Sequence, residues 1–155
     1  MYCITDILKD VFLFNGIPKK DISYFCSLSG CEIISYEKNE LMLSANTDKK
    51  IGIILDGKAT IISADDEVII NKLAVGDIYG VATLFDNPSH QTKVVSASKL
   101  TALTLNREFV QSCIEYSSKI SINYIEFLAK KIDFFTKYVK KYLQNGQLYG
   151  KINIP

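Results

Sequence analysis

The 155 residues are enough for one domain with a buried core, and 48% of them are hydrophobic. A formal net charge of +1 favours neither a nucleic acid nor a membrane surface as partner of the whole chain. The charge is uneven: residues 1–118 carry 11 basic and 15 acidic side chains, and residues 119–155 carry 7 and 2. We interpret the basic end as the solvated face of a helix, with nucleic-acid contact as the alternative.

No segment of the sequence is typical of export or of membrane insertion. No apolar leader opens the chain, and no apolar run approaches the ~20 residues that a membrane span needs. We therefore expect a cytoplasmic protein without a membrane partner. The four cysteines, Cys3, Cys26, Cys31 and Cys113, show no C-x-x-C spacing and lie among apolar residues, which is typical of buried reduced thiols.

The first part of the chain predicts helices, and the middle predicts strands. Residues 5–14 have a helical period with Thr5 as N-cap, Gly16 and Pro18 interrupt it, and residues 21–28 predict a further turn or two of helix. From residue 31 the apolar period falls to two, which predicts strands over residues 32–36, 41–44, 51–55, 58–62, 68–73, 93–97 and 100–105.

The turns between these strands define the fold class. Asp56-Gly57 between two apolar runs predicts a hairpin with a type I′ turn. Short strands about ten residues apart, joined by Gly/Asp turns, are typical of an all-β sandwich or jelly roll. We therefore expect a mainly β fold with flanking helices, built as a double-stranded β-helix (jelly roll).

After residue 105 the period becomes helical again. Asn106 is placed to cap a short helix, and a long helix is expected from about residue 118 to residue 145, with Gly146 ending it. Apolar residues recur along the long helix at spacings of 3, 4, 3, 4 and 3, as in a coiled-coil seam: Ile125, Leu128, Ile132, Phe135, Val139 and Tyr142.

A second apolar line of the long helix consists of Tyr124, Phe127, Phe134 and Tyr138. We expect this second line to pack on the β-domain and the seam to meet a twofold-related copy, so that the chain forms a homodimer. The alternative is a long helix that is wholly buried within one subunit. The lysines beside the seam favour the dimer, because they need contact with water.

Catalytic motifs are missing from the sequence. His90 is the only histidine, so neither a metal-dependent cupin site nor a nucleophile–histidine triad has its ligands or its base. A haem- or metal-ligating role for His90 is an alternative to a solvated loop histidine. There is no Gly-x-Ser-x-Gly elbow and no Walker loop. We expect no enzyme, no bound metal and no cofactor.

Residues 75–97, VGDIYGVATLFDNPSHQTKVVSA, contain the most informative pattern. Gly76 and Gly80 bracket a turn, and an apolar cluster follows it. Such a layout suits a backbone cradle for a small anion, because exposed backbone N–H groups favour negative charge. The cationic residues that such a cradle would need are missing.

The whole layout resembles the cyclic-nucleotide-binding domain of the cyclic AMP receptor protein / fumarate–nitrate regulator (Crp/Fnr) family over about residues 8–145. Two segments carry the resemblance. IILDGKA at residues 53–59 is similar to the family's strand–Gly–strand turn, and GDIYGVATLF at residues 76–85 is similar to its phosphate-binding cassette. The resemblance implies ligand contacts at Gly80, Val81, Ala82, Gln91, Thr92, Phe135 and Thr136.

Two departures from the family pattern concern the nucleotide itself. The resemblance implies a glutamate for the ribose hydroxyl where this chain has Val81, and an arginine for the cyclic phosphate where it has Gln91. On the long helix, Phe135 takes space near the implied place of the base. We therefore do not expect cyclic AMP to bind in the standard way.

The resemblance implies three parts: a β-roll with flanking helices (1–117), a dimerisation helix (118–146), and a linker or strand (147–155) leading to a helix-turn-helix domain that is absent from this chain. We expect an effector-sensing, dimerising domain of a transcription regulator, with a small-molecule effector and with DNA bound through that further domain. The alternative is a ligand-independent, apolar-ligand or haem-sensing domain whose nucleotide pocket is collapsed around Val81, Phe85 and Phe135.

Overall fold

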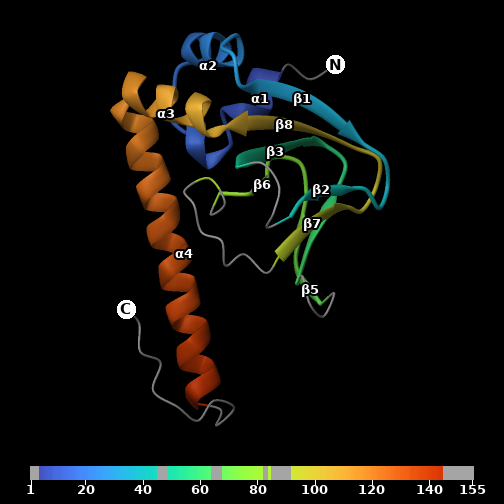
Figure 1. The fold of residues 1–155 in the computed structure, drawn as a ribbon. Helices are drawn as coiled ribbons and strands as arrows, with labels where there is room; N and C mark the ends of the chain where they lie inside the picture. The colour runs from blue at the N-terminus through green and yellow to red at the C-terminus, as the bar shows by residue number, and fades with distance from the viewer. Residues whose placement is uncertain (1–3, 45–48, 64–67, 82–83, 85–91, 145–155) are drawn as a thin grey trace.

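The structure is a computed structural model that describes residues 4–44, 49–63, 68–81, 84 and 92–144. Its elements follow the expected order of helices, strands and helices (Figure 1). They are α1 (Ile4–Leu8), η1 (Phe12–Phe14), α2 (Lys19–Cys26), β1 (Cys31–Tyr36), β2 (Leu41–Leu43), β3 (Lys50–Asp56), β4 (Ala59–Ser63), β5 (Ile69–Leu73), β6 (Ile78–Tyr79), β7 (Thr92–Ser96), β8 (Leu100–Asn106), α3 (Arg107–Tyr116) and α4 (Ser118–Gln144).

The described strands form two antiparallel sheets of four strands each. One sheet has the order β1-β8-β3-β6, and the other has the order β2-β7-β4-β5. Successive strands alternate between the sheets more often than they pair with each other, as in a jelly roll. The mainly β class with flanking helices and a long C-terminal helix is therefore confirmed.

Strand β8 shows how the core is organised. Its side chains alternate, so that Leu100 and Ala102 face the second sheet while Leu103 and Leu105 face the helices. All four are at most 2% exposed, because the first sheet is covered on both sides. One core cluster therefore lies between the sheets, and another lies between the first sheet and the helices.

Asp56-Gly57 does not form the expected hairpin. Strand β3 pairs with β8 and β6, whereas β4 pairs with β7 and β5, so this turn carries the chain from one sheet to the other. Gly57 has φ +88°, but Asp56 has no positive φ, which excludes a type I′ turn. A Cβ at Gly57 would lie 2.4 Å from the carbonyl oxygen of Lys99, so the close approach of residues 99–100 also requires glycine.

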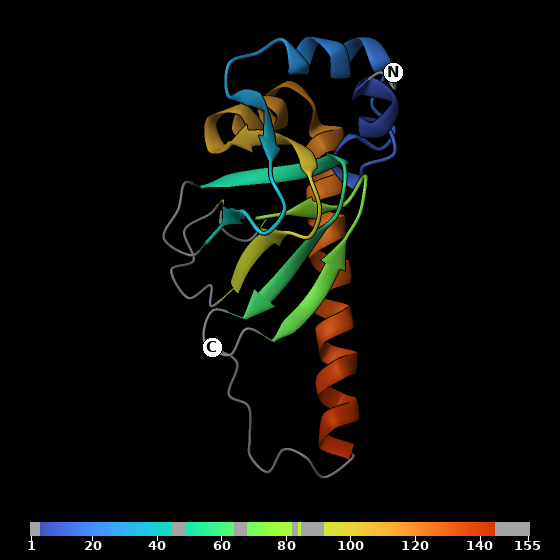
Figure 2. The ribbon, with the colours of Figure 1, turned by 90° about the vertical axis from the view of Figure 1, so that its right-hand side faces the viewer.

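The helical ends differ from expectation in detail. The first predicted helix is divided into α1 and η1, because the backbone at Val11 is extended, and Thr5 lies inside α1. Asn106 caps α3 as predicted, since its side chain accepts a hydrogen bond from the Phe109 N–H at 2.8 Å. In Figures 1 and 2 the C-terminal half of α4 extends beyond the sheets.

Candidate ligand site

The turn before β6 is tied to the first sheet. The Gly76 N–H donates to the Ile54 carbonyl at 2.8 Å, and the Ile54 N–H donates to the Asp77 carbonyl at 3.0 Å. The Asp77 carboxylate closes the turn by accepting from the Ala74 N–H at 2.8 Å. Gly76 has φ +89°, with open space where a Cβ would lie, so glycine is needed there for its backbone conformation alone.

Gly80 follows β6 and lies directly against β3. Its φ is +80°, and a Cβ there would lie 2.4 Å from the Lys50 carbonyl oxygen and 3.1 Å from a methyl carbon of Leu43. Both the conformation and the close approach therefore exclude a side chain. This glycine brings the start of the cassette into contact with both sheets.

Tyr79 fills the space between the sheets next to this point. A Cβ at Gly52 would lie only 1.9–2.3 Å from three atoms of the Tyr79 ring and hydroxyl, so the ring rests on the bare backbone of Gly52. Tyr79 is 2% exposed, and its hydroxyl lies near Tyr36 but makes no hydrogen bond of ordinary geometry among the described residues. Burial, with a smaller effect of nearby Tyr36, raises the pKa of the Tyr79 hydroxyl well above its ordinary range.

The cassette is joined to α4 by one buried hydrogen bond. The Tyr124 hydroxyl donates to the Val81 carbonyl at 3.0 Å, and Tyr124 and Val81 are 6% and 9% exposed. Burial raises the pKa of Tyr124 to about 12, so the hydroxyl stays protonated and remains a donor at neutral pH. A movement of the cassette backbone at Val81 would therefore act directly on α4.

The first half of α4 is anchored to the N-terminal segment. The Asn123 amide donates to the carbonyls of Leu13 at 3.1 Å and Asn15 at 2.8 Å. The Phe127 ring stacks on Phe12 with centroids 3.9 Å apart and planes 6° apart. These contacts confirm that Tyr124 and Phe127 face the domain, as predicted.

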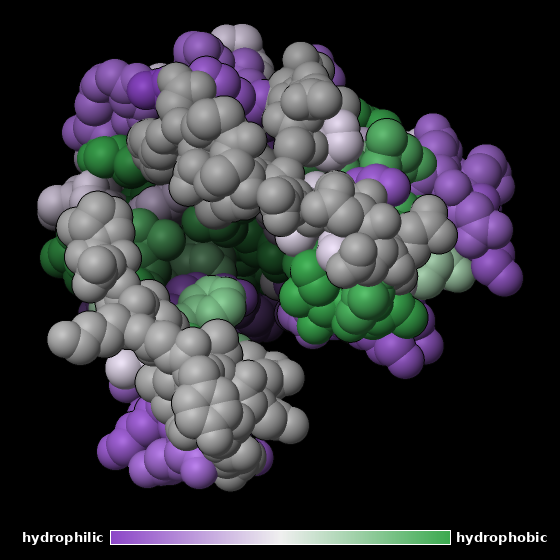
Figure 3. Space-filling model, turned by 60° about the horizontal axis from the view of Figure 1, so that its bottom comes forward, coloured by the Kyte–Doolittle hydropathy of each residue, from purple (hydrophilic) through white to green (hydrophobic). Residues whose placement is uncertain are grey.

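Between Leu128 and Phe135 the apolar side chains of α4 are exposed. Phe134, which was predicted to pack on the β-domain, is 64% exposed. Its expected role is therefore wrong, while the side chain of Tyr138 lies outside the described residues. Figure 3 views the molecule with the bottom of Figure 1 turned forward, and it shows a hollow with apolar side chains between α4 and the sheets.

Most of the predicted seam is exposed as well. Ile125 is 64% exposed, Leu128 40%, Ile132 67% and Phe135 61%, and Val139 is partly buried. The side chain of Tyr142 lies outside the described residues.

The predicted ligand residues fall into separate groups. Gly80 and Val81 lie against β3 and Tyr124, whereas Phe135 is 11 residues beyond Tyr124, about 17 Å along a helix. The Thr136 hydroxyl donates to the Ile132 carbonyl at 2.8 Å. Thr92 begins β7, opposite Ser63, and Ala82 and Gln91 lie outside the described residues. Because Phe135 is exposed, it does not fill a collapsed pocket in this subunit.

Sequence reasoning missed Tyr79 and Tyr124 as parts of this region. Tyr124 was assigned to the correct face of its helix, but a helical period does not show which backbone group its hydroxyl meets. Tyr79 belongs to a two-residue strand, which is too short for a period-two signal.

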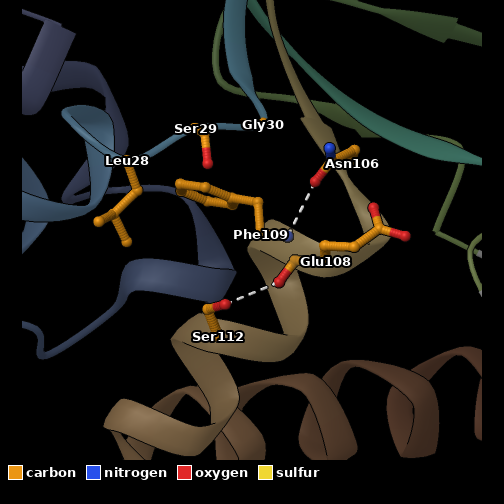
Figure 4. Close-up of a pocket in the computed structure, with 7 residues that line it drawn as sticks. All are labelled: Leu28, Ser29, Gly30, Asn106, Glu108, Phe109 and Ser112. Atoms are coloured by element: carbon orange, nitrogen blue, oxygen red, sulfur yellow. Dashed lines mark hydrogen bonds between the residues drawn. The ribbon is translucent and has the colours of Figure 1, made fainter.

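A separate surface pocket of about 400 Å³ lies where β8 joins α3 (Figure 4). It is lined by Leu28, Ser29, Gly30, Asn106, Glu108, Phe109 and Ser112. Its polar groups already serve α3: Asn106 accepts from the Phe109 N–H, and the Ser112 hydroxyl donates to the Glu108 carbonyl at 2.9 Å. None of the ligand residues predicted from the sequence lines it.

No group of three or more His, Cys, Asp or Glu side chains in the described part of the chain is arranged to hold a metal ion. No helix there is both long and apolar enough to cross a membrane. His90 lies outside the described residues.

The fold and the glycine-bracketed turn define a class of small ligand-binding β-rolls. The family model of the cyclic nucleotide-binding domain matches residues 33–117, which is more than half of the chain. The chain belongs to this family, whose members are regulatory domains; the expectation of a non-enzymatic domain is confirmed. No protein with a curated functional description matches the sequence.

Solved structures share the fold at low sequence identity. The catabolite activator protein of Thermus thermophilus matches with a TM-score of 0.75 and 16% identity, over 83% of this chain and 62% of that one. The N-terminal domain of a transcriptional regulator from Streptomyces coelicolor matches with a TM-score of 0.68 and 11% identity, over 85% of this chain and 96% of that one. The chain thus spans about three fifths of the length of the activator protein.

A regulatory subunit of a cAMP-independent protein kinase A from Trypanosoma brucei is also similar. A triple mutant of it, in which one substitution replaces threonine by arginine, is bound to cAMP in its A site. It matches with a TM-score of 0.62 and 17% identity, over 81% of this chain and 49% of that one.

Proposed function

We propose that this chain is the effector-sensing, dimerising domain of a Crp/Fnr-type transcription regulator that does not hold cyclic AMP in the family's standard way. The family and the fold shared with the catabolite activator protein support the regulatory role. DNA would be bound by a C-terminal domain that is not in this chain. The effector would be a small molecule, and no cofactor is needed.

The observation that carries the proposal is the Tyr124–Val81 hydrogen bond. It joins the cassette, where an effector would contact the backbone, to the helix that would set the geometry of a dimer. Suppose that the cassette backbone at Val81 has two positions and that each goes with one position of α4. An effector that binds one of them more tightly would shift the equilibrium between the two positions of α4 by its difference in binding free energy. The buried apolar surroundings of both residues make this link stiff.

The chemistry of the cassette argues against standard cyclic AMP binding. Val81 offers no carboxylate where the resemblance implies the glutamate, and Gln91 offers no charge where it implies the arginine. Arg107 is the only arginine of the sequence, and it begins α3. Each charge-assisted hydrogen bond contributes about 1.5–3 kcal/mol, so the loss of one lowers affinity roughly 10- to 150-fold.

The exposed seam of α4 supports a homodimer. Four of its residues are 40–67% exposed in one subunit, and they follow one helical stripe. A contiguous exposed apolar surface of this kind is typical of protein–protein contact. A twofold-related α4 covers the same stripe on both subunits at once.

Sedimentation equilibrium of two matched variants tests the dimer. Ile132→Glu places a charge in the seam, and Ile33→Glu places the same charge on β1, where Ile33 is 60% exposed. We expect the wild type and Ile33→Glu to be dimers and Ile132→Glu to be a monomer with unchanged far-UV circular dichroism. A monomeric wild type, or a dimeric Ile132→Glu, would contradict the proposed interface.

Titration with cyclic AMP tests the effector side. The wild type is expected to show no thermal shift at micromolar cyclic AMP, whereas Val81→Glu/Gln91→Arg is expected to gain one. The arginine-containing mutant of the trypanosomal subunit, bound to cAMP, supports this design. Val81→Gln/Gln91→Met is the control, because it keeps similar side-chain volumes without the charges. Stabilisation of the wild type by micromolar cyclic AMP would refute this part of the proposal.

A second candidate is a ligand-independent, apolar-ligand or haem-sensing domain with a filled nucleotide pocket. The packing of Tyr79 on Gly52 favours it, because the ring occupies space between the sheets. Thermal-shift screening of haem and of small haloaromatic compounds separates the two candidates. No shift with any compound would favour a ligand-independent domain.

A further inference from the structure

Three cysteines, which the sequence analysis treated as buried reduced thiols, gather at one place in the fold. Cys26 is the last residue of α2, Cys31 is the first residue of β1, and Cys113 lies on α3. All three contact the same apolar cluster between the helices and the first sheet. Of the three, Cys113 is buried, whereas Cys26 and Cys31 are partly exposed.

A tight turn brings Cys26 and Cys31 together. The Ser27 N–H donates to the Tyr24 carbonyl and the Leu28 N–H to the Phe25 carbonyl, both at 3.0 Å, so the chain is still helical just after Cys26. Gly30 then reverses its direction with φ +90°. The surface pocket of Figure 4 opens beside this turn, since Leu28, Ser29 and Gly30 form one of its walls.

The two thiols interact in a way that makes them unequal. A hydrogen bond from the Cys31 side chain lowers the pKa of Cys26, whereas the same contact and burial raise the pKa of Cys31. Burial raises the pKa of Cys113 to about 12. A thiolate, not a thiol, reacts with oxidants, and the lowered pKa of Cys26 favours it as the thiol that reacts first.

We propose that Cys26 and Cys31 are an oxidisable dithiol that a peroxide converts to an intramolecular disulfide. The Cys26 thiolate attacks one peroxide oxygen, the O–O bond breaks, and after uptake of a proton the products are Cys26 sulfenic acid and water. The Cys31 sulfur then attacks the Cys26 sulfur, the S–S bond forms, and a second water leaves. The two sulfurs together lose two electrons, which the peroxide oxygens accept.

The position of the turn gives this modification a structural effect. The Gly30 carbonyl accepts from the Asn106 N–H at 2.9 Å, and a Cβ at Gly30 would lie 2.4–2.7 Å from the Asn106 side chain. Asn106 caps α3, which leads into α4. A disulfide that tightens residues 26–31 therefore acts on the N-terminus of α3. The proposal does not depend on the effector-sensing role.

Peptide mapping of the full chain tests the proposal directly. Trypsin releases Cys26 and Cys31 together in residues 21–38, Cys113 in residues 108–119 and Cys3 in residues 1–9. The reduced protein is treated with hydrogen peroxide, then with catalase, and free thiols are alkylated before digestion. We expect peptide 21–38 to carry no alkyl group and to be two hydrogens lighter than its free dithiol form, with Cys113 still alkylated and with full reversal by dithiothreitol.

Variants separate the two steps. Cys31→Ser is expected to accumulate a Cys26 sulfenic acid that dimedone traps, while Cys26→Ser leaves Cys31 alkylated after the same treatment. Cys113→Ala is the matched control and is expected to leave the 26–31 disulfide unchanged. The proposal is overturned if peptide 21–38 remains doubly alkylated, if it is crosslinked to peptide 108–119, or if the oxidised chain migrates as a disulfide-linked dimer. Wild-type mapping alone decides between these outcomes.

Discussion

The contact between Gly52 and Tyr79 makes the sharpest prediction, because it places β6 and the cassette against the first sheet. Gly52→Ala would introduce a methyl carbon 1.9 Å, 2.2 Å and 2.3 Å from three atoms of Tyr79. Ordinary carbon–carbon contacts are about 3.5–4.0 Å, so the ring must retreat by more than about 1 Å. Tyr79 is 2% exposed and lies between packed sheets, which leaves the ring no free space.

We expect Gly52→Ala to lower the free energy of unfolding by about 2–3 kcal/mol, the upper range for overpacking of a core. Tyr79→Leu lacks all three clashing atoms, so in that background the added methyl group should cost far less. The double-mutant cycle should therefore give a coupling free energy of about 1–3 kcal/mol. Urea unfolding followed by far-UV circular dichroism measures it, since the sequence has no tryptophan for fluorescence.

All four proteins are compared at one concentration, because a dimer's unfolding depends on concentration. Additive effects of Gly52→Ala and Tyr79→Leu would show that the ring does not rest on Gly52. An unchanged stability of Gly52→Ala alone would refute the packing argument in the same way.

Further predictions concern single polar side chains. Tyr79→Phe removes a buried hydroxyl without a well-formed hydrogen bond, so it should raise the free energy of unfolding by about 1 kcal/mol. A lower free energy of unfolding for this variant in urea would show that the hydroxyl has a hydrogen-bond partner. Tyr124→Phe leaves the Val81 carbonyl without its donor and should cost about 1–3 kcal/mol. Folding raises the pKa of Tyr124 from 10 to about 12, so the contribution of its protonated hydroxyl to the free energy of unfolding is complete below pH 10 and is lost between pH 10 and 12. The stability of Tyr124→Phe should therefore fall less over this pH range than that of the wild type. An identical fall in both proteins would contradict the raised pKa. Asn106→Ala removes the cap of α3 and should cost about 1 kcal/mol by thermal unfolding, whereas Asn106→Asp should retain most of it.

Strand and helix positions were predictable where local patterns are long. Strand β8 is mostly apolar over six residues, LTALTL, and Asn106 has the residue type and the position of a helix cap. Strand β6 was not predictable, because two residues carry no period. Asp56-Gly57 has a hairpin signal, but a local signal cannot tell which sheet the next strand joins.

For the candidate site, the sequence predicted which residue types are present and which are missing, but not which of them contact each other. The sequence itself shows the glycines of the cassette and the absence of a glutamate and an arginine at the expected places. It does not show that the Tyr124 hydroxyl meets the Val81 carbonyl, 43 residues earlier in the chain. The helical period placed Phe127 and Phe134 on one line, yet only Phe127 meets the domain.

By itself, the sequence determined the order and type of the longer elements, the cap of α3, the backbone turns that need glycine, and the missing charges of the cassette. These properties depend on residues a few positions apart, whose conformational preferences and polarity are local. The tertiary structure alone decided that β3 and β4 join different sheets, that Tyr79 rests on Gly52, and that Cys113 packs against the same apolar cluster as Cys26 and Cys31. Hydropathy specifies that a side chain is buried but not which distant group it touches, and that choice follows from packing the whole chain.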